Sequence, residues 1–373
     1  MAQRRTAPHP LGRIVRWTAS LLLVALALAS ALPLLATDAW AVRALDFARL
    51  QFGVVLLVIV LLAVLFDAGR GPAGLLALAA GGAGLGVNAA ALAPCAPLAA
   101  PTVPTTEACE PGVRLRLLIA NVQKSDEGAA RLLATIEDAR PDLILAMETD
   151  AWWDEALRPL HDAYPHRVQH IPEDAVAYGM HLLSRLPLED ARVELWFDAV
   201  TPTIVADAAL PDGRTVRLLG LHPRPPLPPD QSSTMRDAHL LRAALLARDA
   251  GVPTVLAGDL NAVPWEATVR RVLRVGGLAD PREGRGLYPT FSAESWWMAW
   301  PLDHVLAQEA WGLSGWEVLP PFGSDHHPVL AELCLGAAPA GTAPWASPGD
   351  LAAAGTAIRA AEALGRRSGG GAP

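Results

Sequence analysis

The stretch from Pro321 to Leu330 reads P-F-G-S-D-H-H-P-V-L and places a carboxylate, Asp325, directly before two imidazoles, His326 and His327. An imidazole titrates near neutral pH, so it can take a proton from water or return one. A neighbouring carboxylate can orient an imidazole or hold a metal ion. Taken alone, a pattern this short favours an ordinary surface turn, so its meaning depends on the rest of the chain.

Other polar residues of catalytic types stand at or just past the ends of apolar runs that predict strands. Asparagine and aspartate favour turns, so each of these residues alone is better explained as a turn residue. The whole set is harder to explain in that way, because eight polar groups of catalytic type recur at strand ends. Besides Asp325 and His326, its members are Asn121, Glu148, His222, Asp259, Asn261 and Asp303.

Apolar strands alternate with segments of helical spacing from residue 114 onward. Helices between the early strands, hairpins in the middle and strands again at the end predict an α/β fold, a two-sheet β-sandwich flanked by helices. Helices are predicted at residues 126–140, 151–160, 230–250 and 265–275. Strands are predicted at residues 114–120, 142–147, 166–169, 175–183, 192–196, 203–210, 215–221, 253–257, 302–307, 315–319 and 328–333.

The order of the motifs resembles the endonuclease/exonuclease/phosphatase superfamily, which has the deoxyribonuclease I-like fold. The resemblance covers residues 113–335, and the motifs G-D-L-N and S-D-H at this spacing are together highly specific. The matching segments are Asn121-Val122, Glu148-Thr149, Tyr178–Leu188 with its S-R-x-P turn, Leu221-His222, Gly258–Asn261, Leu302–Val305 and Ser324–His326.

The resemblance implies a metal-dependent phosphoester hydrolase and gives the motif residues their roles. Glu148 would be an oxygen ligand for Mg²⁺, or for Mn²⁺, with Asn121 offering its amide oxygen and Asp325 lying at or behind the metal site. His326 would be the general base toward water, and Asp303 would orient it.

The remaining motif residues would bind the water and the phosphate. Asp259 would hold the attacking water, Asn261 would donate to a phosphate oxygen, and His222 would bond the phosphate from the other side. Arg224, in the stiff segment H-P-R-P-P, would clamp a second phosphate. His327 has no such role and is expected to be a capping or core histidine. Carboxylates around a phosphate are repulsive without a cation, so the residue types themselves also require a divalent ion.

The first hundred residues contain most of the hydrophobic excess of a chain that is 52% hydrophobic and only 18% charged. Residues 14–36, 50–66 and 72–93 are predicted as transmembrane helices of a multi-pass cell-membrane protein. The alternative for the first is a cleaved signal peptide. Four arginines before it place the N-terminus in the cytoplasm, so three spans would make the catalytic domain extracytoplasmic. A re-entrant third segment would reverse that sidedness.

The rest of the chain is divided by composition into a Pro-rich linker at residues 94–112, a catalytic domain at 113–335 and an Ala/Gly/Pro-rich tail at 336–373. The tail is expected to be disordered, with a helical turn or two near residues 352–364 as the alternative. Cys95 and Cys109 lie at the two ends of the linker. They would either close a small loop in an oxidising compartment or remain unrelated thiols.

The sequence leaves the substrate open, because the fold alone does not decide it. The net charge of -8 and the absence of a basic run near the motifs argue against a nucleic acid, so a membrane-anchored nuclease is the second hypothesis and a non-catalytic interaction module the third. The W-W-M-A-W stretch at residues 296–300 suits a lipid substrate at a bilayer, or else core packing. The architecture resembles a membrane-anchored bacterial branch that includes teicoplanin-resistance-type proteins, which implies a phosphorylated membrane lipid as substrate. No protein partner is inferred.

Overall fold

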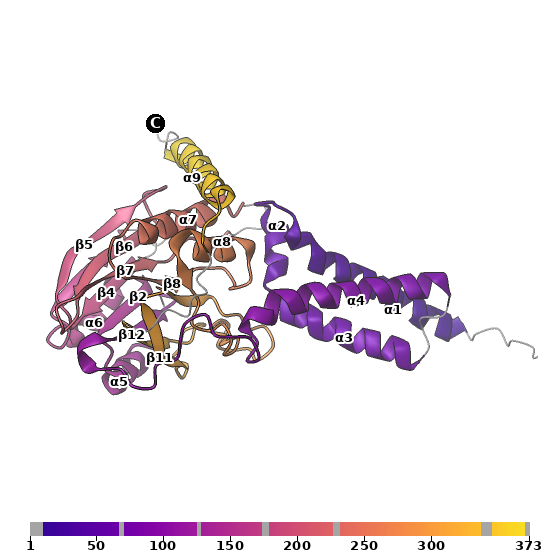
Figure 1. Ribbon diagram of the computed structural model, residues 1–373, viewed down its shortest axis with the longest axis horizontal. Coiled ribbons are helices and arrows are strands. Elements are labelled where there is room, and N and C mark those ends of the chain that lie inside the picture. Colours follow the sequence, from indigo (N-terminus) through magenta and orange to yellow (C-terminus); the bar gives the residue numbers. More distant parts are fainter. Residues whose placement is uncertain are drawn as a thin grey trace, which may run out of the picture. The chain divides into compact units, whose positions relative to one another are not determined.

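The computed structural model describes residues 10–66, 71–124, 128–173, 179–226, 232–336 and 345–369. Contacts divide the chain into two compact units, Met1–Pro94 and Cys95–Pro373 (Figure 1). The starts of three predicted elements, at residues 126, 175 and 230, lie outside the described residues, as does Tyr178 of the motif that ends in the S-R-x-P turn.

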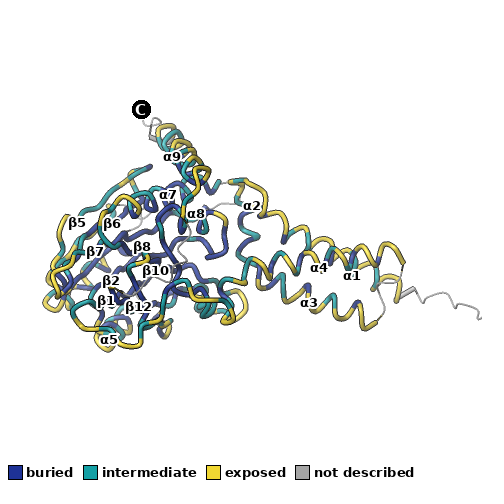
Figure 2. Tube along the Cα trace, viewed as in Figure 1, coloured by how far each residue is buried: buried dark blue, intermediate teal, exposed yellow. Residues whose placement is uncertain are grey.

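The N-terminal unit consists of apolar helices, and many of their large hydrophobic residues are exposed. Figure 2 shows these helices with many exposed positions. Two segments, Gly12–Leu34 and Pro72–Cys95, are long and apolar enough to cross a membrane. A third crossing requires Trp40–Asp46 and Arg49–Leu65, which meet at a 68° bend, to act as one span. The helices are α1 (Pro10–Ala31), α2 (Trp40–Arg43), α3 (Arg49–Leu65) and α4 (Pro72–Leu92).

A polar network joins α1, α3 and α4 inside this unit. Arg49 NH1 donates to the Ser30 carbonyl at 3.1 Å and to Asn88 Oδ1 at 3.3 Å, and Asn88 Nδ2 donates to Ser30 Oγ at 2.9 Å. Glycines allow the helices to approach, as their frequency in residues 72–93 predicts: a Cβ on Gly84 would lie 2.9 Å from the Cα of Ala27. A buried charge is costly unless it is paired, so the network favours one arrangement of the three helices.

The C-terminal unit contains two six-stranded sheets, ordered β11-β12-β1-β2-β4-β3 and β5-β6-β7-β8-β10-β9. A continuous apolar core with side chains from both sheets lies between them, which confirms the predicted sandwich. The strands are β1 (Arg114–Asn121), β2 (Leu143–Thr149), β3 (His166–His170), β4 (Gly179–Ser184), β5 (Leu188–Leu195), β6 (Pro202–Ala209), β7 (Thr215–Leu221), β8 (Thr254–Asp259), β9 (Leu278–Ala279), β10 (Asp303–Gln308), β11 (Trp311–Val318) and β12 (Val329–Leu335).

Helices cover the outer face of each sheet. On the first sheet, α5 buries its Leu132 and Ile136, one helical turn apart, among side chains of the strands. The second sheet has a corresponding outer core beneath α7 and α8. The helices are α5 (Ala129–Ala139), α6 (Ala151–Leu157), α7 (Thr234–Arg248) and α8 (Ala267–Gly276).

Strand direction decides which polar residues can meet. β1 and β2 are parallel, as are β7 and β8, so their carboxyl ends lie at a common edge of each sheet. β10 runs antiparallel to β8 with Asp303 opposite Asp259. Asp303 is the first residue of β10, at the start of the strand predicted at residues 302–307. The antiparallel pairing returns the amino end of β10 to the edge where β8 ends.

The segment before β1 is packed against the domain rather than forming an open linker. Val103 is buried in the core between the sheets. Cys109 forms a disulfide with Cys334 in β12, whereas Cys95 is a buried free thiol. Of the two alternatives, the Cys95–Cys109 loop is wrong, and only Cys95 remains a free thiol. Pairing depends on distance after folding, and the two bonded residues, 225 apart in sequence, have Cα atoms 5.7 Å apart.

The tail contains a helix, α9 (Pro348–Gly369), which covers and extends the helical turn or two considered near residues 352–364. Ala361 is buried in a small cluster with α7, and Asp350 accepts hydrogen bonds from Arg274 Nε at 3.0 Å and NH2 at 2.6 Å. Alanine is the best helix former, and α7 supplies the apolar surface that an isolated tail would lack. Residues 337–344 lie outside the described part of the tail.

Replacing Cys334 with serine is expected to lower the stability of the C-terminal unit by about 2–5 kcal/mol, because a disulfide across a long loop restricts the unfolded chain. Denaturant unfolding of the full chain in detergent measures the change, with Cys95→Ser as the control that removes a thiol outside the disulfide. Equal midpoints for wild type, Cys109→Ser and Cys334→Ser would contradict a formed bond.

Candidate active site

The predicted residues converge where β1, β2, β7 and β8 end and β10 begins, beside the loop that precedes β12. Hydrogen bonds and close approaches between side chains connect the two sheets at this edge. The six residues that meet there are Asn121, Glu148, His222, Asp259, Asp303 and His326.

The amide of Asn121 links the two sheets. Its Nδ2 donates to Glu148 Oε1 at 2.9 Å and to Asp259 Oδ2 at 3.0 Å, across the sandwich. Its Oδ1 accepts from the backbone N–H of Gln123 at 3.0 Å. The amide oxygen has a second lone pair, so the role of Asn121 as an oxygen ligand stays a prediction. The amide nitrogen of Asn121 positions two carboxylates.

The position of Glu148 depends on a backbone irregularity in β2. The pairing of β2 with β4 shifts register between Met147 and Thr149, and Glu148 has a φ of 58°. Such a bulge re-aims a side chain out of the strand's alternation and is common beside active sites. Only glycine fits at position 179 of β4, which pairs with Thr149, since a Cβ there would lie 2.2 Å from the Thr149 carbonyl oxygen.

The glycine of the G-D-L-N motif brings β7 and β8 unusually close. Gly258 has a φ of 139°, and a Cβ there would lie 1.9 Å from the carbonyl oxygen of Leu221. This approach places the buried His222 beside both carboxylates. Its Nε2 is 3.7 Å from Asp259 Oδ2 and 3.4 Å from Glu148 Oε1.

The S-D-H loop presents His326 to the same carboxylate from the opposite side. Its Nδ1 hydrogen-bonds to Asp303 Oδ2 at 2.8 Å, and its Nε2 lies 3.6 Å from Asp259 Oδ2. The ring of Phe291 lies 4.9 Å from the imidazole, centroid to centroid. Because Asp303 accepts a proton-bearing Nδ1, Nε2 is the nitrogen that faces the centre of the site.

Burial and mutual charge set the ionisation of this cluster. Burial raises the pKa of Asp259. Burial alone would lower the pKa of His326, but the Asp303 and Asp259 carboxylates outweigh it and raise this pKa to about 10. Burial would also raise the pKa of Asp303, but the charge and hydrogen bond of His326 outweigh it and lower this pKa. Asp303 and His326 therefore form a carboxylate–imidazolium pair.

Two sets of donor atoms could hold a metal ion, and the atoms of each set lie within 4.8 Å of one another. One set is Glu148, His222 and Asp259, and the other is Asp259, Asp303 and His326. Asp303 and His326 already bond each other, whereas the Glu148 side chain is 22% exposed and accessible to an entering ion. The donor chemistry fits a divalent cation between Glu148 and Asp259, since carboxylate oxygens suit hard cations.

Asn261 and Asp325 lie at this edge but make contacts other than those predicted. Asn261 Nδ2 donates to the Pro223 carbonyl at 3.1 Å, and its backbone N–H donates to Asp259 Oδ1 at 2.9 Å, so it ties the loops after β7 and β8 together. The backbone N–H of Asp325 donates to Gln123 Oε1 at 3.1 Å. Burial and the nearby Glu148 carboxylate raise the pKa of Asp325. Asp325 belongs to neither donor set among the described residues.

Arg224 and His327 have other contacts. Arg224 lines a small pocket with Asp198 and His239, and its role as a clamp on a second phosphate stays a prediction. His327 hydrogen-bonds through Nδ1 to the Leu319 carbonyl at 2.9 Å, which confirms the expected structural role.

Two buried arginines behind the site were not predicted. Arg236 NH1 donates to the Asn261 carbonyl at 2.7 Å, and Arg282 NH1 donates to the Asp303 carbonyl at 3.1 Å. Each therefore holds the backbone of a motif residue. Arginines on a helix or after a turn normally face solvent, so no signal in the sequence distinguishes these two from the others.

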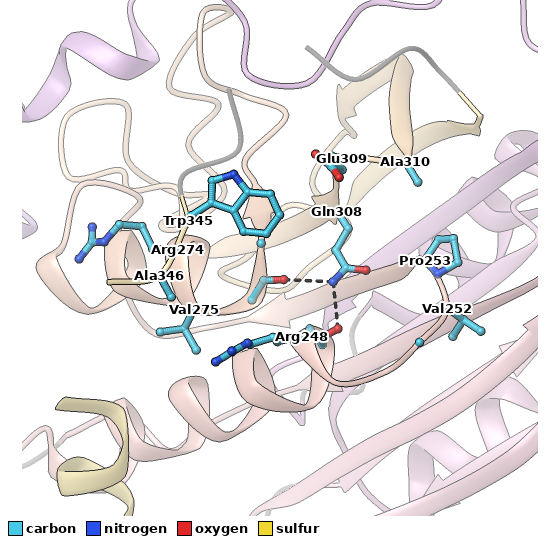
Figure 3. Close-up of a pocket in the computed structure, with 14 residues that line it drawn as sticks. Arg248, Val252, Pro253, Arg274, Val275, Gln308, Glu309, Ala310, Trp345 and Ala346 are labelled. Carbon is cyan, nitrogen blue, oxygen red and sulfur yellow. Dashed lines mark hydrogen bonds between the residues drawn. The ribbon is translucent and has the colours of Figure 1, made fainter. Parts of the chain in front are cut away.

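A second cavity lies at the opposite ends of β8 and β10 (Figure 3). Gln308 Nε2 donates there to the carbonyls of Ala247 at 2.9 Å and Gly276 at 3.1 Å, near the ends of α7 and α8. The described residues that line it include no histidine or aspartate, and Trp345 of the tail forms one wall. We therefore place the chemistry at the other edge of the sheet.

One solved structure with the same fold supports the assignment of the architecture. An endonuclease/exonuclease/phosphatase from Beutenbergia cavernae matches 61% of this chain and 73% of its own at 22% identity and a TM-score of 0.50. The human Nocturnin catalytic domain is also similar, at 17% identity and a TM-score of 0.48, over 61% of this chain and 96% of its own. Sphingomyelinase C from Streptomyces griseocarneus is similar at 17% identity and a TM-score of 0.45, over 59% of this chain and 99% of its own. No curated protein matches the chain. Residues 118–326, more than half of the chain, match the sequence pattern of the Endonuclease/Exonuclease/phosphatase family, and the protein belongs to that family.

Proposed function

We propose that the C-terminal unit is a divalent-metal-dependent phosphoesterase that hydrolyses a phosphate or pyrophosphate ester of a membrane lipid. The observation that supports the reaction class best is the Asp303–His326 pair facing Asp259, with Glu148 at the far side of the same carboxylate. Membership of the family supports the same class of reaction.

Each residue of the cluster would have one task. Glu148 and Asp259 would hold the cation, Mg²⁺ in the first place and Mn²⁺ as an alternative, while Asn121 keeps the two carboxylates in place. When bound, the ion would offset the negative charge of the phosphate and of the leaving oxygen. His222, beside both carboxylates, would hydrogen-bond the phosphate.

Proton transfer would run through His326. A water that bridges the 3.6 Å between His326 Nε2 and Asp259 Oδ2 would lose its proton to Nε2 as it attacks phosphorus. Asp303 would stabilise the imidazolium that forms and keep the ring oriented. Because the neighbouring carboxylates raise the pKa of His326, the neutral base becomes more abundant as the pH rises.

The lipid substrate is supported by an exposed apolar loop beside His326. The loop starts at Phe291, which packs on His326, and the side chains of Trp296, Trp297 and Met298 are 91%, 36% and 47% exposed. Large apolar side chains exposed together indicate a binding surface, and tryptophan favours the membrane interface. Core packing, the other explanation for this stretch, does not account for such exposure.

An extracytoplasmic position for this unit is supported by two independent features. The arginines before the first apolar helix favour a cytoplasmic N-terminus. The Cys109–Cys334 disulfide is the kind of bond that persists outside the reducing cytoplasm. Both features agree with three membrane crossings, in which the bent pair counts as one span.

The direct test is phosphate release by the full chain in detergent micelles with Mg²⁺, offered undecaprenyl pyrophosphate in one reaction and supercoiled plasmid in another. Phosphate from the lipid with intact plasmid is the expected result. Nicked plasmid without lipid turnover would instead assign a nuclease. No turnover of either substrate, by protein that retains its unfolding transition, would contradict the lipid proposal.

Replacing Trp296 and Trp297 together with alanine is expected to raise KM for a long-chain lipid pyrophosphate in vesicles roughly ten- to hundredfold, because two anchoring side chains are lost. KM for water-soluble dimethylallyl pyrophosphate should change little. Trp345→Ala is the matched control, since Trp345 is 82% exposed but lines the cavity at the opposite end of the sheet. An equal loss on both substrates would contradict a lipid-binding loop.

A further inference from the structure

Lys124 is the single lysine among the 30 lysine and arginine residues of the chain. It lies three residues after Asn121, in the loop that leaves β1 at the candidate active site. The other 29 of these 30 residues are arginines, including the two that support the site from behind. The position of the one primary amine in the folded domain therefore requires a physical explanation.

Backbone contacts fix this loop against the catalytic cluster. The backbone N–H of Lys124 donates to the Glu148 carbonyl at 3.1 Å. The side chain of the preceding residue, Gln123, accepts from the backbone N–H of Asp325 at 3.1 Å, and its own N–H donates to Asn121. Gln123 and Lys124 have φ values of 53° and 48°, a conformation that is unfavourable for residues with a Cβ. Such strain is typical of functional sites.

The charge around the loop favours a cation at this position. The loop bonds the backbone of the acidic residues Glu148 and Asp325, and Asp259 and Asp303 belong to the same cluster. A phosphoester brings further negative charge, of which a single divalent ion offsets two units. The buried Arg236 and Arg282 are already engaged with backbone carbonyls behind the site. Lys124 belongs to the loop that leaves β1 at this edge, and the four-carbon stem of a lysine can follow a substrate group.

The choice of lysine over arginine has a physical reason. The planar guanidinium of an arginine forms bidentate pairs with carboxylates, so at this position it would bind Glu148 or Asp325 and compete with the metal ion. An ammonium is a compact charge with three rotatable donors and can exchange a carboxylate for a phosphate oxygen. Both arguments point to binding of a substrate group rather than to support of the fold.

We propose that Lys124 binds the outer phosphate of the substrate and makes the site selective for pyrophosphate esters and phosphomonoesters over phosphodiesters. This proposal rests on the proposed phosphoesterase function and specifies its substrate class. A diester carries one negative charge and has no terminal phosphate, so it gains little from the amine. A pyrophosphate ester offers an outer phosphate with two or more anionic oxygens.

The single lysine makes the binding test direct. The full chain in detergent with Mg²⁺ is acetylated by an amine-selective reagent, and mass spectrometry follows the peptide that contains Lys124. Methylenediphosphonate, a non-hydrolysable pyrophosphate analogue, is expected to slow acetylation about tenfold or more, whereas dimethyl phosphate should not. Equal rates with and without methylenediphosphonate would overturn the proposal.

Arg140 offers a matched control. It has a φ of 44°, close to that of Lys124, and it lies after α5, at the opposite end of β1 from the site. The amine introduced by Arg140→Lys should be acetylated at the same rate with and without methylenediphosphonate. Protection of both amines would indicate an effect on the reagent and would overturn specific binding at Lys124.

Kinetics then separates binding from folding. Lys124→Met keeps most of the apolar stem and is expected to raise KM for a pyrophosphate ester about tenfold or more, with a smaller change in kcat and little change for a diester. Equal losses on both substrates would overturn the proposal. If methylenediphosphonate protects Lys124 from acetylation but the wild type does not turn over the lipid, the lipid substrate is excluded and the role of Lys124 stands. If the wild type turns over the lipid but Lys124 is not protected, the role of Lys124 is excluded and the lipid substrate stands.

Discussion

Replacing His326 with alanine is expected to lower kcat by about 10²–10⁴-fold, the usual contribution of a general base. The imidazole is the group whose Nε2 faces Asp259 across the gap where the attacking water would lie, and its Nδ1 is held by Asp303. Steady-state phosphate release under saturating substrate measures the loss. An active His326→Ala protein would remove His326 from the proton-transfer step.

His327 supplies the control for this substitution. It is the same residue type one position further along, but its ring hydrogen-bonds to the backbone carbonyl of Leu319. His327→Gln should therefore keep kcat within about twofold, even where it lowers stability by the ~1 kcal/mol of one hydrogen bond. Comparable losses of kcat in both variants would mean that the loop, rather than the base, was damaged.

The pH dependence follows from the same pair. The Asp303 and Asp259 carboxylates outweigh burial and raise the pKa of His326, so the neutral base is scarce below that pKa. We expect kcat/KM to rise with pH above the ordinary histidine range. Asp303→Asn removes one of these charges, lowers the pKa of His326 and should shift the rise to lower pH while reducing the maximum rate. An unchanged profile would contradict this coupling.

Replacing Glu148 with glutamine is expected to have the second large effect, a fall in kcat/KM of about 10²-fold or more together with a need for at least tenfold more Mg²⁺. Glutamine keeps the shape and can still accept a hydrogen bond from Asn121 Nδ2, but it removes the negative charge that a hard cation requires. Chelation of metal by EDTA should abolish wild-type activity, and Mg²⁺ should restore it. Titration of Mg²⁺ at fixed substrate measures both effects.

Glu317→Gln is a suitable control for the Glu148 variant, because Glu317 is an exposed carboxylate on β11. Its removal should change neither the rate nor the Mg²⁺ requirement. Wild-type Mg²⁺ dependence in the Glu148 variant would exclude Glu148 as a ligand and leave the set of Asp259, Asp303 and His326 as the alternative cation site.

The sequence alone was sufficient for the fold class and for most of the catalytic cluster. Buried strands appear as apolar runs, and strands that end at one sheet edge leave their polar residues there. Asn121, Glu148, His222 and Asp259 could be found for this reason. The short motifs around them are local in sequence, so their recognition did not depend on knowing the tertiary contacts.

Strand direction and side-chain partners were decided by the tertiary structure. Asp303, at the start of its strand, reaches the edge where β8 ends because β10 pairs antiparallel with β8, and no local pattern states that direction. The amide of Asn121 bonds two carboxylates and a backbone N–H, partners that its place at a strand end does not reveal. Arg236 and Arg282 became recognisable only through the backbone carbonyls that they hold.

Long-range contacts decided the remaining differences. Cys109 pairs with Cys334, 225 residues away, because folding brings β12 beside the segment that precedes β1. The tail forms α9 because α7 offers it an apolar surface, although its composition alone indicated disorder. The stretch with Trp296 had two explanations in the sequence, and only its exposure in the fold separates them. Composition determines which residues can be buried, whereas burial itself depends on what the rest of the chain places against them.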